Sequence, residues 1–434
     1  MEGDLIITGG RPLNGTVRIP AAKNSVLPLL AASLLCSSPV RLRAVPELAD
    51  VDTSLQLLQS AGCEAGWQGS DIVVQGVPGV CRLGADAAAR MRASILFCAP
   101  LLARLGRAET VLPGGCRIGA RPVDLHLSGL AQMGAVCRAE GERLILTAPS
   151  GLHGAEITLR FPSVGATETL LLAAAAAQGK TVLRGVAREP EIVDLAAFLN
   201  RCGACVQGAG SSTIRVEGRR SLSGCSFAPM ADRIVASTFA CACAAAGGRV
   251  ELTGCAPEIY RPLLEILEQM GCSVKYGPES VVVSRFGRLH GAGKVFTGVY
   301  PALATDAAPL LAAAMLTADS ESSIEDVVFE RRFACAEGFA AFGGRVCTEG
   351  RTLCILPCTG LKGANTAAPD LRGGAALVIA ALAAQGKSRV TNTALIDRGY
   401  AGFAPMLAEL GSEIRRETRP SDGTEKKRHA KNQF

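Results

Sequence analysis

A helix-like segment that ends at a glycine recurs six times in this chain of 434 residues. Successive glycines are 72, 69, 68, 72 and 68 residues apart. Glycine directly after the last residue of a helical pattern is the expected stop, because it enters the left-handed conformation without strain. Such a period indicates one supersecondary unit used six times. The segments are LLQSAGCEA (Gly62), LAQMGAVCR (Gly134), LNRCGACVQ (Gly203), LEQMGCSVK (Gly271), FAAFGGRVC (Gly343) and LAELGSEIR (Gly411).

Each stop is followed by two short alternating runs around a turn, which is typical of a β-hairpin. A second helix follows, apolar on nearly every face and therefore expected inside a domain, and then a further strand. We expect an α/β fold of six such units. The period leaves open whether they form one ring, three pairs or two triplets. The second helices are NSVLPLLAASLL, RASILFCAPLLARL, GATETLLLAAAAA, RIVASTFACACAAA, TDAAPLLAAAML and RGGAALVIAALAA.

Composition favours a cytoplasmic protein with a core of small side chains. Hydrophobic residues make up 48% of the chain and aromatic residues only 4%, so Ala, Leu, Val and Ile must fill the core. The 17 cysteines are scattered singly, which argues against a secreted disulfide framework. Cys202 and Cys205 form the only CxxC, and there are four histidines. We therefore expect no metal site.

The two ends of the chain indicate neither a membrane nor a nucleic-acid partner. MEGDLIITGG is acidic, and the apolar run VLPLLAASLLC is too short to span a bilayer. Residues 415–434 carry seven Lys or Arg against three Asp or Glu, within a chain of net charge +6. This tail could bind nucleic acid, but no aromatic side chains are interleaved. We expect residues 419–434 to be a solvated, disordered end.

Charged residues stand at the first turn of the apolar helices. Asp306 and Ser163 can be read as helix caps that need no ligand. Lys23, Arg92, Arg233 and Arg372 cannot, because a cation at a helix amino terminus opposes the helix dipole. Four violations of one rule predict a cleft where helix ends and cations bind anions. The cations lie at the starts of four of the six helices.

Eleven segments between residues 5 and 418 form a more specific pattern. In order they are IPAAKNSVLPLLAASLL, DVDTS, MRASILF, LPGGCRIGARPVDLHLSGL, PSVGATET, AREPEIVD, ADRI, TDAA, VFERRF, DLRGGAALV and IDRGY. GGCRIGARPVDLH is highly specific, whereas DVDTS alone would be weak. Together the segments resemble the UDP-N-acetylglucosamine 1-carboxyvinyltransferase family of enolpyruvyl transferases.

The resemblance implies a fold that the period leaves open. It implies two inside-out α/β barrel domains, each of three βαβαββ-type units with helices buried within. The first domain would span residues 22–230, and the second would combine residues 1–21 with 231–418. The chain would then cross between the domains twice, beside the cleft.

The resemblance also implies a reaction, the transfer of the enolpyruvyl group of phosphoenolpyruvate to the 3'-hydroxyl of UDP-N-acetylglucosamine with release of phosphate. It proceeds by addition and elimination through a tetrahedral intermediate and is the first committed step of peptidoglycan synthesis. A donor with a phosphate and a carboxylate needs several fixed cations. The residues that match the family's phosphoenolpyruvate site are Lys23, Asn24, Arg121, Arg398, Asp370 and Arg372.

The sugar-nucleotide site implied by the resemblance draws on several segments. Asp306 matches the carboxylate that binds the 3'-hydroxyl and acts as general base. His126 could be a second acid, but we expect a structural histidine. The other matching positions are Arg92, the run Arg121, Pro122, Val123, Asp124 and Leu125, the helix start Ser163, Val164 and Gly165, and Val328.

Cys116 is the predicted proton donor. It lies between Gly115 and Arg117, with Arg121 nearby, and cations increase the acidity of a thiol. The resemblance implies that this loop is a lid, that Cys116 protonates the enol or helps to expel phosphate, and that the epoxide fosfomycin alkylates it. With Lys23, Asp306 and Arg398, it completes the predicted catalytic set.

Three positions depart from the family pattern. Ala308 stands where a glutamine is usual, Leu395 where a histidine is common, and Val235 where an acid is frequent. These changes put hydrogen bonding around the site in question and leave the catalytic positions intact. They motivate one alternative, a catalytically silent sensor of UDP-sugars.

A second alternative is the related enzyme that uses shikimate 3-phosphate. It lacks the cysteine loop and the RPVDLH segment, so the sequence favours the sugar nucleotide. We expect no metal or organic cofactor, no membrane or nucleic-acid partner, and a monomer whose partners are its two small-molecule substrates.

Overall fold

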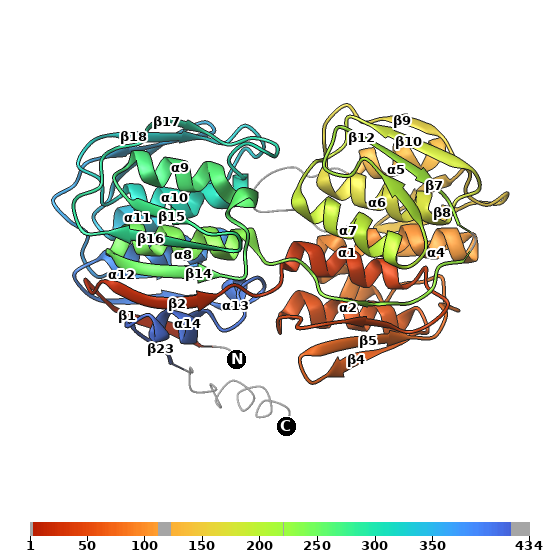
Figure 1. Cartoon of the computed structure of the whole chain (residues 1–434), viewed down its shortest axis with the longest axis horizontal. Helices are drawn as coiled ribbons and strands as arrows, with labels where there is room; N and C mark the ends of the chain where they lie inside the picture. The colour runs from red at the N-terminus through yellow and green to blue at the C-terminus, as the bar shows by residue number, and fades with distance from the viewer. Residues whose placement is uncertain (1–2, 112–122, 220, 418–434) are drawn as a thin grey trace, which may run out of the picture.

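The computed structural model describes residues 3–111, 123–219 and 221–417. They form two bodies of helices and strands that lie side by side (Figure 1). Helices α1 to α7 belong to one body and α8 to α14 to the other (Figure 1). The expected α/β class is therefore confirmed. No helix in the described ranges is long and apolar enough to cross a membrane.

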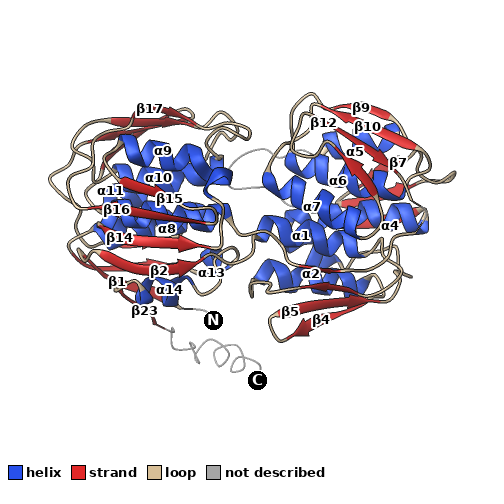
Figure 2. Ribbon diagram, in the orientation of Figure 1, coloured by secondary structure: helices blue, strands red, loops and turns tan. Residues whose placement is uncertain are grey.

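Six sheets form the outer layers of the two bodies (Figure 2). In strand order the first three are β13 (Ser226–Phe227), β3 (Val40–Leu42), β5 (Asp71–Gln75), β4 (Glu64–Gln68); β6 (Arg107–Val111), β8 (Arg143–Thr147), β7 (Val136–Glu140); and β11 (Cys205–Gln207), β12 (Thr213–Glu217), β10 (Lys180–Arg184), β9 (Glu156–Thr158). The others are β15 (Ser273–Tyr276), β16 (Ser280–Arg285), β14 (Gly248–Thr253), β2 (Leu13–Arg18); β17 (Gly293–Phe296), β18 (Ser322–Glu325), β20 (Thr352–Leu356), β19 (Arg345–Glu349); and β21 (Asn365–Ala367), β22 (Gly386–Thr391), β1 (Asp4–Gly9), β23 (Glu413–Glu417).

Five sheets contain one parallel pair, made by an edge strand and an inner strand. In three of them the edge strand directly precedes a buried helix and its partner follows that helix. In the other two the edge strands are exchanged: β2 precedes α1 but pairs with β14, which follows α8, and β13 precedes α8 but pairs with β3, which follows α1. The pairs are β13 with β3, β9 with β10, β2 with β14, β17 with β18, and β21 with β22. In the sixth sheet an isolated parallel bridge joins Arg82 to Glu109 instead. The hairpin strands complete each sheet in antiparallel register. This is the βαβαββ arrangement expected for each unit.

The apolar helices lie inside, behind the sheets (Figure 2). In α12, every residue from Arg372 to Leu382 is buried. Their many alanines allow three helices to pack closely in each body. The predicted helix at residues 92–105 instead begins as a 3-10 turn. These inner helices are α1 (Lys23–Ser33), η1 (Arg92–Phe97) with α4 (Cys98–Leu105), α6 (Val164–Ala176), α8 (Arg233–Ala246), η3 (Thr305–Ala307) with α10 (Ala308–Met315), and α12 (Leu371–Ala383).

The six glycine stops are confirmed. All six glycines have φ between +86° and +102°, in the left-handed region, where residues with a Cβ are strained. Each follows one of the outer helices: α2 (Ala49–Ser60), α5 (Asp124–Gln132), α7 (Pro190–Arg201), α9 (Arg261–Gln269), α11 (Ala336–Ala341) and α14 (Phe403–Glu409). The short helices α3 (Ala85–Arg90), η2 (Pro257–Tyr260) and α13 (Ala394–Asp397) lie outside the repeat.

The buried side chains form two hydrophobic clusters. One runs from Val26 to Leu222, and the other combines residues 5–19 with residues 234–410. Where the chain passes between them, Ala21 bridges Ala231 in antiparallel fashion, and the Asp232 amide donates to the Pro20 carbonyl at 2.8 Å. We propose that the clusters are the cores of the two domains expected over residues 22–230 and over 1–21 with 231–418.

Candidate active site

Lys23, Asp50 and Arg398 form one ion-paired cluster between the two bodies. Lys23 begins α1, Asp50 lies in the first turn of α2, and Arg398 directly follows α13. Lys23 Nζ lies 2.6 Å from Asp50 Oδ2. Arg398 Nε and Nη2 lie 3.0 and 3.2 Å from Asp50 Oδ1 and Oδ2. The carboxylate therefore bridges two cations, one from each body.

The electrostatics of this cluster favour an added anion. Burial lowers the pKa of Lys23, and the charges of Arg398 and Arg372 lower it further, against the opposing effect of Asp50. Burial alone would raise the pKa of Asp50, but Lys23 and Arg398 outweigh it and the pKa is lowered. Lys23 and Arg398 thus share one carboxylate, Asp50, which leaves positive charge for a ligand to balance.

Asp50 was not among the predicted site residues. It lies in the DVDTS segment, whose match is weak by itself. A carboxylate in the first turn of a helix is common because its charge suits the helix dipole. Nothing in the sequence therefore distinguishes Asp50 from an ordinary residue at a helix start. Only the fold brings its side chain, 7% exposed, against Lys23 and Arg398.

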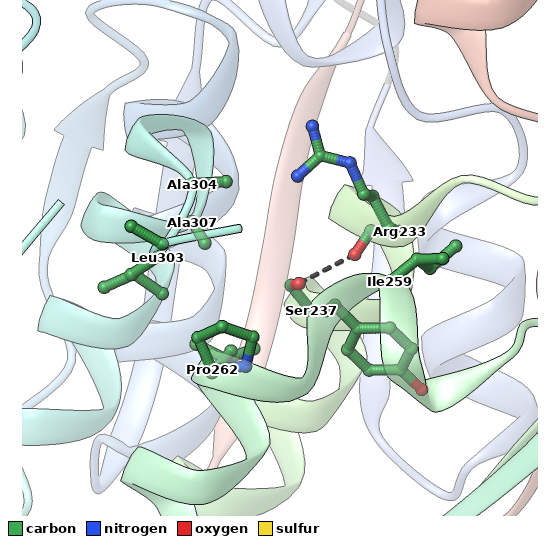
Figure 3. Close-up of a pocket in the computed structure, with 10 residues that line it drawn as sticks. Arg233, Ser237, Ile259, Pro262, Leu303, Ala304 and Ala307 are labelled. Atoms are coloured by element: carbon green, nitrogen blue, oxygen red, sulfur yellow. Dashed lines mark hydrogen bonds between the residues drawn. The ribbon is translucent and has the colours of Figure 1, made fainter. Parts of the chain in front are cut away.

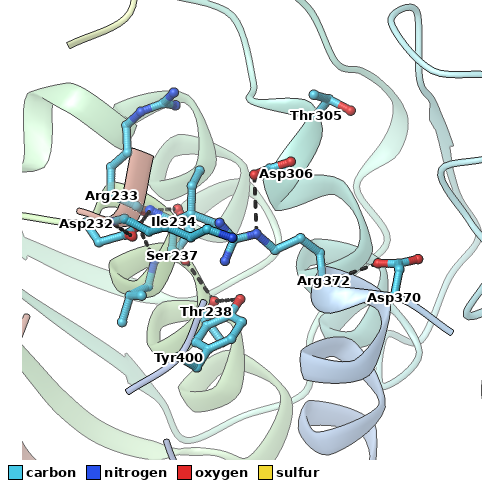
Figure 4. A network of polar contacts seen from close by, with 12 residues as sticks. Asp232, Arg233, Ile234, Ser237, Thr238, Thr305, Asp306, Asp370, Arg372 and Tyr400 are labelled. Carbon is cyan, nitrogen blue, oxygen red and sulfur yellow. Dashed lines mark hydrogen bonds and ion pairs between the residues drawn. The ribbon is translucent and has the colours of Figure 1, made fainter. Parts of the chain in front are cut away.

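Asp306 is held by two buried arginines, Arg332 and Arg372, of which Arg372 is labelled in Figure 4. Arg372 Nε lies 3.3 Å from Asp306 Oδ2, and Arg332 Nη2 binds Asp306 Oδ1. Arg332 Nε also donates to the Thr305 carbonyl at 2.7 Å. The side chains of Arg332 and Arg372 are 2% and 3% exposed. Arg332 lies in the quoted VFERRF segment, but no helix-start pattern singled it out.

The capping alternative is wrong for Asp306 and correct for Ser163. The residues at the cap positions of η3 and α10 are Ala304 and Ala307, so Asp306 lies within the 3-10 turn. Its carboxylate is directed instead to Arg332 and Arg372. Ser163, in contrast, accepts a hydrogen bond from the Ala166 amide at 3.3 Å and caps α6.

Polar atoms beside Asp306 lack partners among the described residues. Asp370 Oδ1 caps α12 by accepting from the Arg372 and Gly373 amides at 3.0 and 2.9 Å, while Asp370 Oδ2 and Arg372 Nη1 are buried without a partner there. The Arg372 guanidinium lies 5.2 Å from the centre of the Tyr400 ring. A buried donor without an acceptor is costly unless a ligand or water satisfies it. This place therefore suits an anionic ligand.

Asp232 connects the two clusters of charge. It caps α8 by accepting from the Ile234 and Val235 amides at 2.8 and 3.0 Å. Its other oxygen accepts from the Lys23 amide at 3.2 Å. The starts of α1 and α8 are thus joined by one carboxylate. Arg372 contacts Asp306 and also lowers the pKa of Lys23, so Lys23, Asp306, Asp370, Arg372 and Arg398 form one charged region.

Part of the predicted sugar-nucleotide site lies at the starts of α5 and α6. Asp124 pairs with Arg160, and Asp124 Oδ1 is buried with no partner in the described part of the chain. A Cβ added to Gly165 would lie 3.1 Å from His126 Cε1. Arg92 begins η1 and is half-buried. Half-buried too are Asn24, Val123, Leu125, Val164 and Val328.

His126 is suited to a structural role. Its Nδ1 lies 2.8 Å from Thr169 Oγ1. Burial lowers its pKa to about 4, and the charge of Arg92 contributes in the same direction. The ring is therefore neutral at pH 7, and a neutral, hydrogen-bonded ring is a poor proton donor. The effect of Arg92 on this pKa also places Arg92 close to His126.

Part of the predicted site lies outside the described residues. Cys116, Arg117, Arg121 and Pro122 fall within residues 112–122, so the predicted lid and the predicted proton donor lie outside the described structure. Within the described ranges, no His, Cys, Asp or Glu side chains form a group of three or more that could hold a metal ion. What the described site offers is fixed charge and one carboxylate, Asp306, between two arginines.

The three departures from the family pattern lie close to this region. Ala308 and Val235 are buried, and Val235 contributes only its amide to Asp232. Leu395 is half-buried in α13, three residues before Arg398. None of the three can offer a side-chain hydrogen bond, so the polar contacts around the site come from Asp232, Arg332 and Tyr400 instead.

Comparison with known proteins relates the chain to enolpyruvyl transferases. The family model for EPSP synthase (3-phosphoshikimate 1-carboxyvinyltransferase) matches residues 7–407. Among solved structures, the enolpyruvyl transferase NikO from Streptomyces tendae superposes with a TM-score of 0.85 at 27% identity, over 96% of this chain and all of that one. EPSP synthase from Acinetobacter baumannii gives 0.72 at 19% identity over the same shares, a likeness of fold alone.

Curated relatives narrow the assignment. UDP-N-acetylglucosamine 1-carboxyvinyltransferase from Nitratidesulfovibrio vulgaris is 42% identical over 414 residues, which cover 95% of this chain and 99% of the relative. The proteins of the same name from Finegoldia magna and Acidiphilium cryptum are 42% and 43% identical, over 93% and 94% of this chain and 96% and 98% of their own lengths. The chain therefore belongs to the enolpyruvyl transferase family and, within it, to the UDP-N-acetylglucosamine 1-carboxyvinyltransferases.

Proposed function

We propose that this chain transfers the enolpyruvyl group of phosphoenolpyruvate to the 3'-hydroxyl of UDP-N-acetylglucosamine and releases phosphate, as a step of peptidoglycan synthesis. The observation that carries the proposal is the charged region in which Lys23 and Arg398 pair with Asp50 and Arg372 pairs with Asp306. It offers cations for a doubly anionic donor and a carboxylate for the attacking hydroxyl. The names of the curated relatives agree with it.

In this proposal the donor's phosphate and carboxylate bind Lys23, Arg121 and Arg398. Asp306 removes the proton of the 3'-hydroxyl while Arg332 and Arg372 fix the orientation of its carboxylate. The oxygen then adds to the enol carbon, and Cys116 delivers a proton to the methylene carbon. Asn24 holds the tetrahedral adduct, which collapses with loss of phosphate and a proton.

The sugar nucleotide would occupy the second group of residues. Asp124, with one unpartnered oxygen in the described structure, suits a donor on the base, and the amides at the start of α6 suit the diphosphate. Arg92 would bind the sugar nucleotide between these two. We also propose that the protein acts in the cytoplasm, as a monomer and without a cofactor.

Phosphate release on mixing the protein with both substrates is the direct test. Asp306→Asn should lower kcat by roughly a hundredfold or more, because general-base catalysis is lost. Asp319→Asn is the matched control, since Asp319 is a surface carboxylate paired with His290, and it should match the wild type. If both substrates bind but no phosphate is released, the protein is a sensor and the proposal is wrong.

Cys116 supplies a second test. Cys116→Ser should abolish most turnover while leaving the affinity for UDP-N-acetylglucosamine nearly unchanged, because serine is too weak an acid to protonate the enol. Cys116→Asp should recover turnover and resist fosfomycin, because the thiol that the epoxide alkylates is gone. Undiminished inactivation of Cys116→Asp by fosfomycin would refute the assignment of this residue.

A further inference from the structure

Side chains of the opposite body approach both backbone polar groups of Tyr300. Arg188 Nη2 donates to the Tyr300 carbonyl at 3.0 Å, and the Tyr300 amide acts on the Glu189 carboxylate, whose pKa it lowers against the larger, opposite effect of burial. A backbone outside regular structure must find partners for both groups. Here two adjacent residues from the loop before α7 supply them, although they belong to the first body and Tyr300 to the second.

A third contact helps to hold Tyr300 in place. The Arg233 guanidinium lies 5.8 Å from the centre of the Tyr300 ring, within reach of a cation–π interaction. Arg233 Nε is itself held by Glu191, at 3.0 and 3.3 Å from its two carboxylate oxygens. The side chains of Arg233 and Glu191 are 10% and 3% exposed, so water screens this pair only weakly.

The segment that contains Tyr300 leads directly to Asp306. The loop is closed at its base by the Gly298 amide, which donates to the Leu303 carbonyl at 2.9 Å. Arg233 faces Leu303, Ala304 and Ala307 across a small cavity (Figure 3). A loop closed in this way moves as one piece, so a displacement at Tyr300 reaches the turn that carries Asp306.

We propose that Arg188 and Glu189 are positioning residues for Asp306. They fix Tyr300 from the opposite body. Because the closed loop connects Tyr300 to the turn that carries Asp306, the Asp306 carboxylate is correctly placed only when the two bodies are correctly apposed. Neither residue touches the reacting atoms in this account. The proposal rests on the proposed function, since it assigns to Asp306 the task of binding and activating the acceptor hydroxyl.

Arg188→Met tests the claim, because methionine keeps an apolar stem and cannot donate to the Tyr300 carbonyl. Loss of a hydrogen bond from a charged donor predicts a fall in kcat of roughly tenfold, with an unchanged KM for phosphoenolpyruvate. Arg188→Lys, which can still donate, should recover most of the loss. Arg184→Ala is the matched control: Arg184 lies on β10 in the same body, in an exposed pair with Glu156, and the variant should equal the wild type.

A double-mutant cycle distinguishes positioning from general loosening. By titration calorimetry, Arg188→Met should weaken UDP-N-acetylglucosamine binding in the wild-type background and have no effect in the Asp306→Asn background. An equal loss in both backgrounds would overturn the proposal, as would a kcat within twofold of the wild type.

If Arg188→Met lowers the thermal midpoint sharply, Glu189→Gln and Glu189→Ala replace it. The glutamine side chain of Glu189→Gln can still accept a hydrogen bond from the Tyr300 amide, so this variant should retain activity, whereas Glu189→Ala should lose it.

Failure of the proposed function has a different signature. If the wild-type protein releases no phosphate, the enzymatic assignment fails for every variant alike. The binding cycle still reports on Arg188, because it requires only that UDP-N-acetylglucosamine binds. Additive losses in that cycle, in a protein that turns over normally, would reject the positioning role alone.

Discussion

At the scale of single residues, the site is organised by carboxylates that each serve two cations or two helix ends. Asp50 joins Lys23 to Arg398, and Asp232 joins α1 to α8. Such buried groups are stable only while both partners are present. The arrangement holds the cations in place before a ligand arrives, so the donor meets a site whose charges are already oriented.

The shifted lysine predicts a pH dependence. Burial lowers the pKa of Lys23 from its ordinary value of 10.5. The protonated form binds the donor and is lost as pH rises, so the KM for phosphoenolpyruvate should increase on the alkaline side earlier than an unperturbed lysine would allow. Lys23→Arg keeps its charge at any accessible pH and should flatten that rise. Steady-state kinetics from roughly pH 7 to pH 10, with the KM for UDP-N-acetylglucosamine as internal reference, decides between these outcomes.

Removal of the lysine charge is the companion experiment. Lys23→Ala should raise the KM for phosphoenolpyruvate by roughly tenfold or more, since a charge-assisted contact to an anion is lost, and change that for UDP-N-acetylglucosamine little. Lys387→Ala serves as control because Lys387 is exposed on β22. Equal effects on both substrates would contradict the placement of Lys23 in the donor site.

At the scale of elements, the helix stop at Gly203 depends on backbone conformation alone. Gly203 follows α7 with φ +97°, and an added Cβ there would meet nothing within 4 Å. Gly203→Ala should therefore destabilise the protein by about 1–2 kcal/mol through left-handed strain. Gly66 in β4 also has open space but no positive φ, so Gly66→Ala should be neutral or slightly stabilising. Denaturant unfolding measures both, and equal effects would show that packing dominates.

Glu109 makes the sheet of β6, β8 and β7 sensitive to acid. Its buried carboxylate pairs with Arg107, Arg82 and Arg143 at 2.7, 2.9 and 2.7 Å. Hydrogen bonds from Arg107, with help from the other two and against burial, lower its pKa from 4.5 to about 2. The stabilisation is therefore full above about pH 4.5 and is lost as pH falls towards 2.

Glu109→Gln should accordingly cost about 1–2 kcal/mol of unfolding free energy at neutral pH, and the difference from the wild type should shrink as the pH falls. Glu156→Gln is the control, because Glu156 and its partner Arg184 are 73% and 49% exposed and such pairs contribute little. A difference for Glu109→Gln that stays constant with pH would contradict the charged role of Glu109.

The repeat explains why much of the fold could be predicted and some of it could not. Glycine stops and all-apolar helices are local signals, so the outer and inner helices were found. The strands β9, β13 and β21 have two or three residues, too few to show alternation, and only their neighbours define them. The 3-10 start at Arg92 reflects packing rather than composition.

Some residues of the candidate site could also be predicted from the sequence, and others could not. Lys23, Arg233 and Arg372 were visible because each breaks a helix rule, and Asp306 and Arg398 because their segments match a known family. Asp50, Arg332 and Tyr400 break no rule. Their importance comes from contacts between distant segments, such as Arg398 with Asp50 across 348 residues, which no local pattern records.

At the scale of the whole molecule, two hydrophobic cores are joined by polar contacts and two adjacent chain crossings. Polar contacts between cores permit relative motion. Calorimetry of the free protein should therefore show two unfolding transitions. Phosphoenolpyruvate with UDP-N-acetylglucosamine should raise the midpoint temperatures of both transitions and bring the two midpoints together, because ligands that bind residues of both bodies couple the unfolding of the bodies. UDP alone is the control. A single two-state transition without ligand would contradict independent cores.

The first strand has a consequence for synthesis. β1 lies between β22 and β23, with Leu5, Ile6 and Ile7 all buried there. At a ribosomal rate of roughly 5–20 residues per second, β22 emerges roughly 20–75 seconds after β1. The body around α1, α4 and α6 can fold during that time. The apolar strand β1 stays unpaired until β22 is made, which makes it a natural substrate for a chaperone that binds nascent chains.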